Sequence, residues 1–374
     1  MIVRLLICFS LLCGFAPHAA AQQPPPVASR AWLLLDVSSG QFIASHNAQE
    51  RVEPASLTKL MTAYLAFAAI ASKTIALDQV APVSERAWRA GGSRMFIEPG
   101  KPVKVEELLH GMIVQSGNDA CIALAELIAG SEEVFAQMMN REAERLGMKN
   151  TSFVNSSGLP DAKHYSSAQD LALLATALIR DFPDLYRFYS IKEYRYNNIT
   201  QQNRNRLLWL DPNVDGVKTG HTENAGYCLI ASARRGPRRL LSVVLGAGSD
   251  STRTQESQKL LNFGFQFYDS ARLYEKGQSI TELAVWKGSE SRLRAGMASD
   301  LYVTVPKGQS DKVKADLVSQ QPLVAPISPG QRVATVRVTL DSRPVGEYPV
   351  VALEAVPVAG FFGRTWDTVR LWFK

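Results

Sequence analysis

Hydrophobic and polar residues follow helical and strand-like periods along the first two thirds of the chain. Apolar runs at 31–37 and 41–45 flank a Ser-Ser-Gly turn, which predicts a β-hairpin. The predicted helices span 57–70, 105–114, 118–128, 132–146, 168–179 and 256–267, and the later strands span 227–233 and 240–245. Strand pairs on both sides of a helical middle predict an α+β domain whose sheet is completed by distant parts of the chain.

The pattern changes at about residue 273, after which the apolar runs are short, β-branched and separated by Gly, Pro, Ser and Asp. The predicted strands of this part span 280–286, 301–305, 333–340 and 350–353. We therefore expect an α+β domain at 29–273 and a small β-sandwich at 274–356, and nothing in the β-rich part looks catalytic.

The first residues predict export from the cytoplasm. Arg4 precedes an apolar run at 5–15, and an Ala-rich site ends at Ala21. This order is typical of a cleaved secretory signal peptide, and the run is too short to span a bilayer as a helix. We assign 1–21 to the signal peptide and 22–28 to a linker.

The last residues predict a membrane contact. In the segment 357–374, a helical period places four apolar residues on one stripe, namely Phe362, Trp366, Val369 and Phe373. A short, aromatic and basic helix of this kind suits the membrane interface. The alternative is a terminal helix docked on its own domain.

Composition narrows the function classes. The chain has 374 residues, of which 46% are hydrophobic, and 41 basic against 35 acidic residues give a net charge of +6. It is too apolar for a disordered chain, and it lacks the basic block of a nucleic-acid-binding protein. The five histidines show no zinc-ligand spacing, so we expect neither a metal nor a cofactor.

The four cysteines exclude a disulfide scaffold. A lipoprotein signal at Cys13 is a rival to the cleaved signal peptide, but the bulky Leu12 fits it poorly. Cys121 and Cys228 are expected to be buried small hydrophobic residues, and the sequence leaves open whether they form a bridge.

Candidate chemistry begins with Ser56 and Lys59, which lie in the first turns of a predicted helix that follows Pro54. Residues three apart share a helix face, so the Lys59 amine should lie beside the Ser56 hydroxyl and act as its base. The helix N-terminus adds free N–H groups for an oxyanion. Alone, a Ser-x-x-Lys pattern is weak evidence, because most instances are a helix cap with a surface lysine.

Two further motifs strengthen this hypothesis. Ser116-Gly117-Asn118 lies at a break between two predicted helices, and Lys218-Thr219-Gly220 lies between strand-like runs. The combination of Ser-x-x-Lys, Ser-x-Asn and Lys-Thr-Gly is typical of β-lactamases and penicillin-binding proteins.

With these motifs, the chain resembles the low-molecular-mass penicillin-binding proteins that are D-alanyl-D-alanine carboxypeptidases. The resemblance extends over EPASLTKLMTAYL, GSRMFIEPG, VQSGNDACIALAE and NRNRLLWLDPNVDGVKTGHTENAGYCLIASA. It implies a transpeptidase-like catalytic domain with an antiparallel sheet, a small all-β domain, and a periplasmic enzyme on the outer face of the inner membrane.

The resemblance also implies roles. Ser56 would attack the bond between the last two D-alanines of a peptidoglycan stem pentapeptide, with Lys59 as base and Lys218 keeping that amine neutral. Ser116 would pass a proton to the leaving amine. The remaining implied positions bind the substrate. Asn118 would hold its amide, and the backbone N–H of His221 would bind its oxyanion. The side of its terminal carboxylate would be bound by Lys218, Thr219, Gly220 and Arg253.

Several alternatives remain at this stage. β-Lactams should acylate Ser56, but a β-lactamase would carry a Glu-x-x-Leu-Asn string between the second and third motifs, and none occurs. A D,D-endopeptidase is a second enzymatic alternative, and a peptidoglycan-binding membrane adaptor is a non-enzymatic one. His164 is expected either at the edge of the active site or as a plain loop residue.

Overall fold

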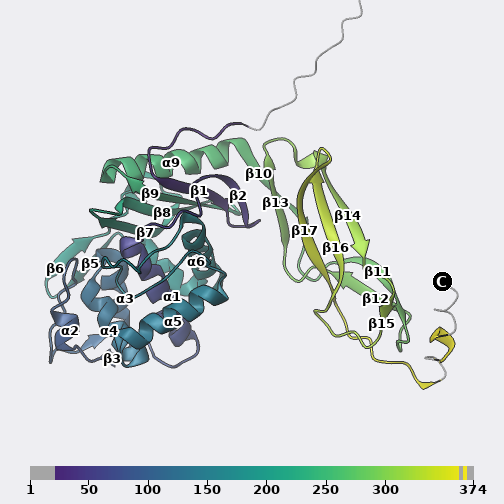
Figure 1. Cartoon of the computed structure of the whole chain (residues 1–374), viewed down its shortest axis with the longest axis horizontal. Coiled ribbons are helices and arrows are strands. Elements are labelled where there is room, and N and C mark those ends of the chain that lie inside the picture. The colour runs from purple at the N-terminus through teal and green to yellow at the C-terminus, as the bar shows by residue number, and fades with distance from the viewer. Residues whose placement is uncertain (1–21, 362–364, 369–374) are drawn as a thin grey trace, which may run out of the picture.

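The computed structural model describes residues 22–361 and 365–368, and it has a helix-containing domain followed by an elongated all-β domain (Figure 1). The predicted signal peptide at 1–21 lies outside the described residues, as do 362–364 and 369–374 of the predicted terminal helix. The predicted fold class, α+β with a small all-β domain behind it, is confirmed.

The first domain is built on a five-stranded antiparallel sheet with the order β2-β1-β9-β8-β7. Its strands are β1 (Ala31–Asp36), β2 (Gln41–His46), β7 (Val214–Thr222), β8 (Gly226–Arg235) and β9 (Arg238–Ala247). Ala31 is paired with Leu245, so the N-terminal hairpin does complete a sheet formed mainly by the distant end of the domain.

Both faces of this sheet are covered, which explains why β1 is apolar at consecutive positions. Leu33 and Leu35 face the large helical core, whereas Trp32 and Leu34 face α9 (Asp250–Phe267) on the other side. Figure 1 shows α9 on one side of the sheet and α1 to α6 on the other. Successive side chains of a strand point to opposite faces, so a strand between two layers is apolar throughout.

The six predicted helices are present with one clear correction, and three further helices of four residues each in the described part of the chain were not predicted. They are α1 (Lys59–Ala71), α2 (Glu85–Trp88), α3 (Val105–His110), α4 (Asn118–Ala129), α5 (Glu132–Arg145), α6 (Ala168–Asp181), α7 (Pro183–Tyr186) and α8 (Leu207–Leu210), with α9 as above. Helix α9 begins at Asp250, six residues before the predicted start. Ser249 caps it by accepting the Thr252 N–H at 3.0 Å, and its polar first turns conceal the apolar period.

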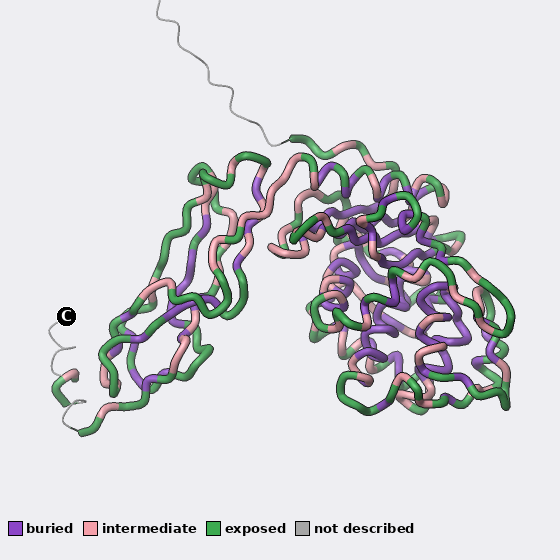
Figure 2. Tube along the Cα trace, turned by 180° about the vertical axis from the view of Figure 1, so that it is seen from behind, coloured by how far each residue is buried: buried purple, intermediate pink, exposed green. Residues whose placement is uncertain are grey.

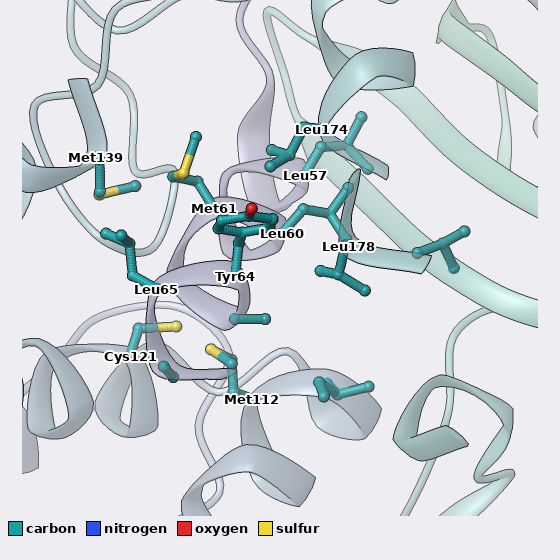
Figure 3. Close-up of a cluster of buried hydrophobic side chains, with 14 of the residues drawn as sticks. Leu57, Leu60, Met61, Tyr64, Leu65, Met112, Cys121, Met139, Leu174 and Leu178 are labelled. Carbon is teal, nitrogen blue, oxygen red and sulfur yellow. The ribbon is translucent and has the colours of Figure 1, made fainter. Parts of the chain in front are cut away.

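Helix α1 is the centre of the core. Ten of its thirteen residues are buried, and Figure 3 shows side chains from several neighbouring segments packed around it. Met112, Cys121 and Met139 approach it from the helices before and after the second motif, and Leu174 and Leu178 approach it from α6. A helix that is apolar on all sides is stable only inside a protein, so its N-terminus is held rigidly.

The second domain has its own core, separate from that of the first (Figure 2). A six-stranded sheet in the order β14-β16-β17-β12-β11-β15 packs against the two-stranded sheet β10-β13. These strands are β10 (Tyr268–Tyr274), β11 (Ser279–Trp286), β12 (Arg292–Gly296), β13 (Leu301–Pro306), β14 (Val313–Ser319), β15 (Leu323–Val324), β16 (Arg332–Leu340) and β17 (Arg343–Ala352). The predictions missed β10, β12, β14 and β15, which have few consecutive apolar residues.

Strand β17 also begins seven residues before its predicted start. Asp341 and Ser342, with φ of 47° and 65°, form a two-residue turn that pairs Leu340 with Arg343. Two residues with positive φ are typical of a tight hairpin, so the ladder extends through a polar stretch.

No helix at 22–361 or 365–368 is both long and apolar enough to cross a bilayer. Over the same ranges, no three His, Cys, Asp or Glu side chains come together as a metal site. Cys121 and Cys228 are both free and buried.

Candidate active site

A cavity of about 300 Å³ lies where η1, the 3₁₀ turn at Ala55–Thr58, meets β7 and the second motif. It is lined by Ser56, Ser93, Ser116, Arg204, Thr219, Gly220, His221, Tyr227 and Arg253. The structure therefore brings six of the nine predicted site residues to one cavity, and the other three, Lys59, Asn118 and Lys218, are buried and outside its lining.

Ser56 lies in the 3₁₀ turn that leads into α1, so the nucleophile candidate precedes the α-helix rather than lying inside it. The preceding Ala55 has φ of 47°, in the left-handed region that side chains rarely adopt. This turn keeps the predicted spacing, and the Lys59 Nζ lies 3.0 Å from the Ser56 Oγ.

The Lys59 amine is 1% exposed and has three oxygen neighbours. Besides Ser56, it donates to the Asn118 Oδ1 at 2.7 Å and to the Ser157 carbonyl at 2.6 Å. A neutral amine has two hydrogens and one lone pair. With both hydrogens bound by the two carbonyl oxygens, the lone pair faces the Ser56 hydroxyl.

Burial lowers the pKa of Lys59, and the positive charge of Arg204 lowers it further. The sequence-based interpretation attributed the lowered pKa of Lys59 to repulsion by Lys218. In the structure removal from water is the largest cause, because a charged amine in a low-dielectric interior loses its hydration. Lys218 is itself buried, and burial and then the charge of Lys59 lower its pKa well below the usual value.

The second motif is at a sharp break in the chain. A π-helical turn at Gly111–Gln115 ends at Ser116, whose φ of 67° is left-handed, and α4 begins at Asn118. The Ser116 hydroxyl is buried at the cavity and has no hydrogen-bond partner among the described residues. A buried polar group without a partner is costly, so a free hydroxyl at this position points to a use in the reaction.

Asn118 differs from its prediction. Its Oδ1 accepts from Lys59, and its Nδ2 donates to the Gly91 carbonyl at 2.7 Å. Both ends of the side-chain amide are therefore bound within the protein. In this structure Asn118 orients the Lys59 amine and does not line the cavity.

The third motif lies on β7, the edge strand beside η1. Gly220 permits this approach, because a Cβ there would lie 3.0 Å from the Pro54 carbonyl oxygen. Thr219 and His221 line the cavity, whereas the buried Lys218 donates to the Thr219 carbonyl at 3.1 Å. A strand edge presents unpaired backbone groups, which suits binding of an extended peptide.

Two positive side chains reach the cavity. The Arg253 guanidinium is largely engaged in the protein, since it donates to the carbonyls of Gly220 at 3.1 Å and Cys228 at 3.4 Å and pairs with Asp250. Arg204 was missed in the sequence-based prediction.

The neighbours of Arg204 along the chain hold its backbone in place. Asn205 donates to the Gly216 carbonyl at 2.9 Å, and Asn203 donates to the Ile191 carbonyl at 2.9 Å. Asparagines on both sides of an arginine thus fix the backbone that presents it. Ser93 and Tyr227 are further lining residues that sequence reasoning missed.

The loop at 150–167 supports the nucleophile from behind. Gly158 has φ of 85°, and a Cβ there would lie 1.8 Å from the Ala55 carbonyl oxygen. His164 is buried, accepts the Val154 N–H at its Nδ1 at 3.1 Å, and lies 2.8 Å from the Thr58 hydroxyl through its Nε2. Of the two alternatives left open for His164, the loop residue fits, because it lies in a loop and outside the cavity lining. Its buried ring holds the turn that carries Ser56 through its contact with Thr58.

The cysteines fit their structural interpretation. Burial raises the pKa of Cys121 to about 12 and that of Cys228 to about 11. A thiol of such high pKa is a poor nucleophile at neutral pH.

A serine beside a buried lysine of lowered pKa, at a helix N-terminus and along a strand edge, defines a serine enzyme of the acyl-transfer class. Comparison with known proteins narrows the class. Residues 18–249 match the family model for D-alanyl-D-alanine carboxypeptidase, and residues 268–358 match that for the C-terminal domain of penicillin-binding protein 5. The chain belongs to the D-alanyl-D-alanine carboxypeptidase family.

Individual relatives agree over nearly the whole length. The chain is 44% identical to the D-alanyl-D-alanine carboxypeptidase DacC of Escherichia coli, over 96% of this chain and 93% of that protein. It is 40% identical to DacA of the same organism, over 93% and 89%. Among solved structures, penicillin binding protein 5 from Haemophilus influenzae matches with a TM-score of 0.85 and 38% identity, covering 90% of this chain and 99% of that one.

A further solved structure was determined with a bound β-lactam. Penicillin-binding protein D2 from Listeria monocytogenes in its ampicillin-bound form matches with a TM-score of 0.61 and 31% identity, covering 66% of this chain and all of that one.

Proposed function

We propose a serine mechanism for this D-Ala-D-Ala carboxypeptidase in which Ser56 is the nucleophile and Lys59 its general base. The observation that carries the proposal is the contact of 3.0 Å between the Lys59 Nζ and the Ser56 Oγ, made by an amine whose pKa burial lowers. Lys59 accepts the hydroxyl proton as Ser56 attacks the carbonyl of the penultimate D-alanine. A general base of this kind contributes about 10²–10⁴ in rate.

The remaining groups complete the first half of the reaction. The backbone N–H groups of Ser56 and His221 bind the oxyanion. Ser116, whose hydroxyl is otherwise unpartnered, passes the proton from Lys59 to the leaving amine. The carbonyl–nitrogen bond then breaks, so D-alanine leaves and an ester forms at Ser56. Water hydrolyses that ester, returns the proton to Ser56 and releases the shortened peptide.

The terminal carboxylate of the substrate binds beside Thr219 and the two arginines. Arg204 offers its charge to this carboxylate, whereas Arg253 holds the strand edge through the Gly220 carbonyl. A charge-assisted contact at this point explains why a free C-terminus is required. Lys218 is buried outside the cavity lining and supports this wall through its bond to the Thr219 carbonyl.

Release of D-alanine tests the mechanism directly. Purified protein should release D-alanine from a peptide that ends in D-Ala-D-Ala, and Ser56→Ala should not. Penicillin should add one penicilloyl mass to the wild type and none to this variant. Equal release by both proteins would refute the role of Ser56.

We further propose where the protein works and how its parts divide. Residues 1–21 direct export to the periplasm, and 22–28 form a linker. The two domains span 29–267 and 268–356, a boundary earlier than the expected 273, because β10 pairs with β13 of the second domain. The segment 357–374 rests on the outer face of the inner membrane. Phe361 and Trp366 are 70% and 65% exposed, as expected for rings that enter a bilayer surface.

Truncation separates this anchor from catalysis. Removal of 361–374 should shift the protein from the membrane to the soluble fraction while D-alanine release from soluble peptides is unchanged. A truncated protein that stays with the membrane would refute the anchor.

A further inference from the structure

A second cavity, of about 570 Å³, lies on the segment between α2 and β4 (Val103–Lys104). Its lining is Trp88, Arg89, Arg94, Phe96, Ile97 and Glu98. The proposed mechanism uses none of these side chains.

The cavity combines exposed aromatic rings with guanidinium groups. Trp88 and Phe96 are each 39% exposed. The Arg89 Cζ lies 5.6 Å from the Trp88 ring centre, and the Arg94 Cζ lies 5.1 Å from that of Phe96. A guanidinium over an aromatic face keeps its hydrogen-bond donors free at the edge, which suits recognition of a carboxylate.

The positive charge of Arg94 is largely uncompensated by its neighbours. Its side chain makes one long hydrogen bond, of 3.5 Å, to the Trp88 carbonyl, and within residues 22–361 no carboxylate forms an ion pair with it. Arg89 pairs with Glu85 at 3.0 Å. The acidic Glu98 is itself paired with Lys101 at 2.7 Å, so its charge is offset.

The backbone holds Phe96 in this exposed position. Its φ of 70° lies in the left-handed region, which bulky residues rarely adopt. Buried Asp119 enforces the geometry by accepting the N–H groups of Met95, Phe96 and Ile97 at 3.0, 2.8 and 3.3 Å. Any residue could make these backbone bonds, so they do not explain an aromatic side chain there.

The same segment leads directly into the catalytic cavity. Ser93 lines that cavity, and the next residue, Arg94, lines the second one. From the hairpin of β5 (Glu193–Tyr196) and β6 (Ile199–Gln202), Gln201 donates to the Arg94 carbonyl at 3.2 Å and Asn197 to the Phe96 carbonyl at 3.1 Å. Consecutive residues of this one segment therefore line the two cavities.

We propose that the second cavity binds the upstream part of the same stem peptide, with the Arg94 guanidinium on a free carboxylate and the Phe96 ring against the aliphatic chain beside it. This inference rests on the proposed function. Two extended residues span about 7 Å, which is the reach from the attacked D-alanine to the carboxylate two residues before it. Such a carboxylate is carried by the γ-linked D-glutamate of a stem peptide.

Two peptides that differ in one group test the inference. L-Ala-γ-D-Glu-L-Lys-D-Ala-D-Ala has the free carboxylate, and the peptide with D-isoglutamine at that position has an amide. The wild type should prefer the acid peptide by about 10-fold in kcat/KM, the effect of one charge-assisted hydrogen bond. Arg94→Gln should abolish this preference, and Phe96→Ala should lower kcat/KM for both pentapeptides.

A short peptide and a matched variant provide the controls. Diacetyl-L-Lys-D-Ala-D-Ala lacks the upstream residues, so both variants should cleave it as fast as the wild type does. Arg141→Gln, at an exposed arginine on α5, should keep the preference for the acid peptide. High salt should remove the wild type's preference for the acid peptide, because salt screens the contact between Arg94 and the carboxylate.

The outcomes separate this inference from the proposed function. If Arg94→Gln retains the preference, or if the variants lose equal activity on the short peptide, the segment acts only as a frame for Asp119 and the inference is overturned. If the wild type releases D-alanine from no peptide, the proposed function fails and the inference fails with it.

Discussion

The buried His164 makes a specific prediction for stability in acid. Burial lowers its pKa to about 4, from 6.5 in an exposed chain, because a charged ring would lose its hydration. The ring also has a fixed tautomer: Nδ1 accepts the Val154 N–H, so Nε2 carries the proton and donates to the Thr58 hydroxyl. Protonation removes the acceptor at Nδ1 and breaks the first of these bonds.

The direction and the magnitude of the change in stability follow from proton linkage. Between pH 6.5 and 4 the unfolded chain binds a proton at this histidine that the folded protein does not, so stability falls as pH falls. A difference of about 2.5 pKa units corresponds to about 3 kcal/mol in total, of which about 2 kcal/mol is lost between pH 7 and pH 5. Above pH 6.5 the contribution is fully present.

The assay is urea unfolding of the wild type and His164→Gln from pH 7 to pH 4, monitored by tryptophan fluorescence. Gln keeps an N–H donor for Thr58 but does not titrate, so the variant should be less stable at pH 7 and show a pH slope shallower by about 2 kcal/mol down to pH 5. His46→Gln, at an exposed histidine on β2, should retain the full slope. Identical slopes for the wild type and His164→Gln would refute the reasoning.

Two further predictions concern the catalytic turn. Because burial lowers the pKa of Lys59, kcat/KM should hold through neutral pH and fall in acid as the amine is protonated. Lys59→Arg, which stays charged, should lose about 10²–10⁴ in kcat/KM and acylation by penicillin, and unchanged rates would contradict its role as base. Gly158→Ala should cost about 3 kcal/mol or more in urea unfolding, because its Cβ would collide with Ala55. Gly147→Ala, at φ of 78° with open space, should cost only about 1 kcal/mol, and equal losses would contradict the collision.

Much of the fold was predictable because it depends on local patterns. The β-hairpin at the start, the helix opened by Ser131 and the change to a β-rich part all follow from periods and caps of a few residues. The errors occur where polar residues occupy regular structure. Helix α9 begins earlier than predicted because a serine cap stabilises its polar first turn. Strand β17 begins earlier because a tight turn pairs its polar first residues with β16. Neither polar stretch has an apolar period.

The active site shows the same division. The Ser56–Lys59 contact was predictable, since residues three apart on one turn must lie side by side. The position of Asn118 was not, because the partners of its two amide ends, Lys59 and Gly91, come from separate parts of the chain. Arg204 was missed for a related reason: only the folded chain brings that loop to the cavity.

By itself the sequence determined the residue types, their spacing within single elements and the apolar character of α1. The tertiary structure decided which side chains meet, and above all that the pKa of the Lys59 amine is lowered. Its pKa falls because α1 is enclosed by the core and the loop at 150–167 covers the amine, so the water that would stabilise the cation is excluded. Exclusion of water depends on every neighbour at once, and no local pattern of residues contains it.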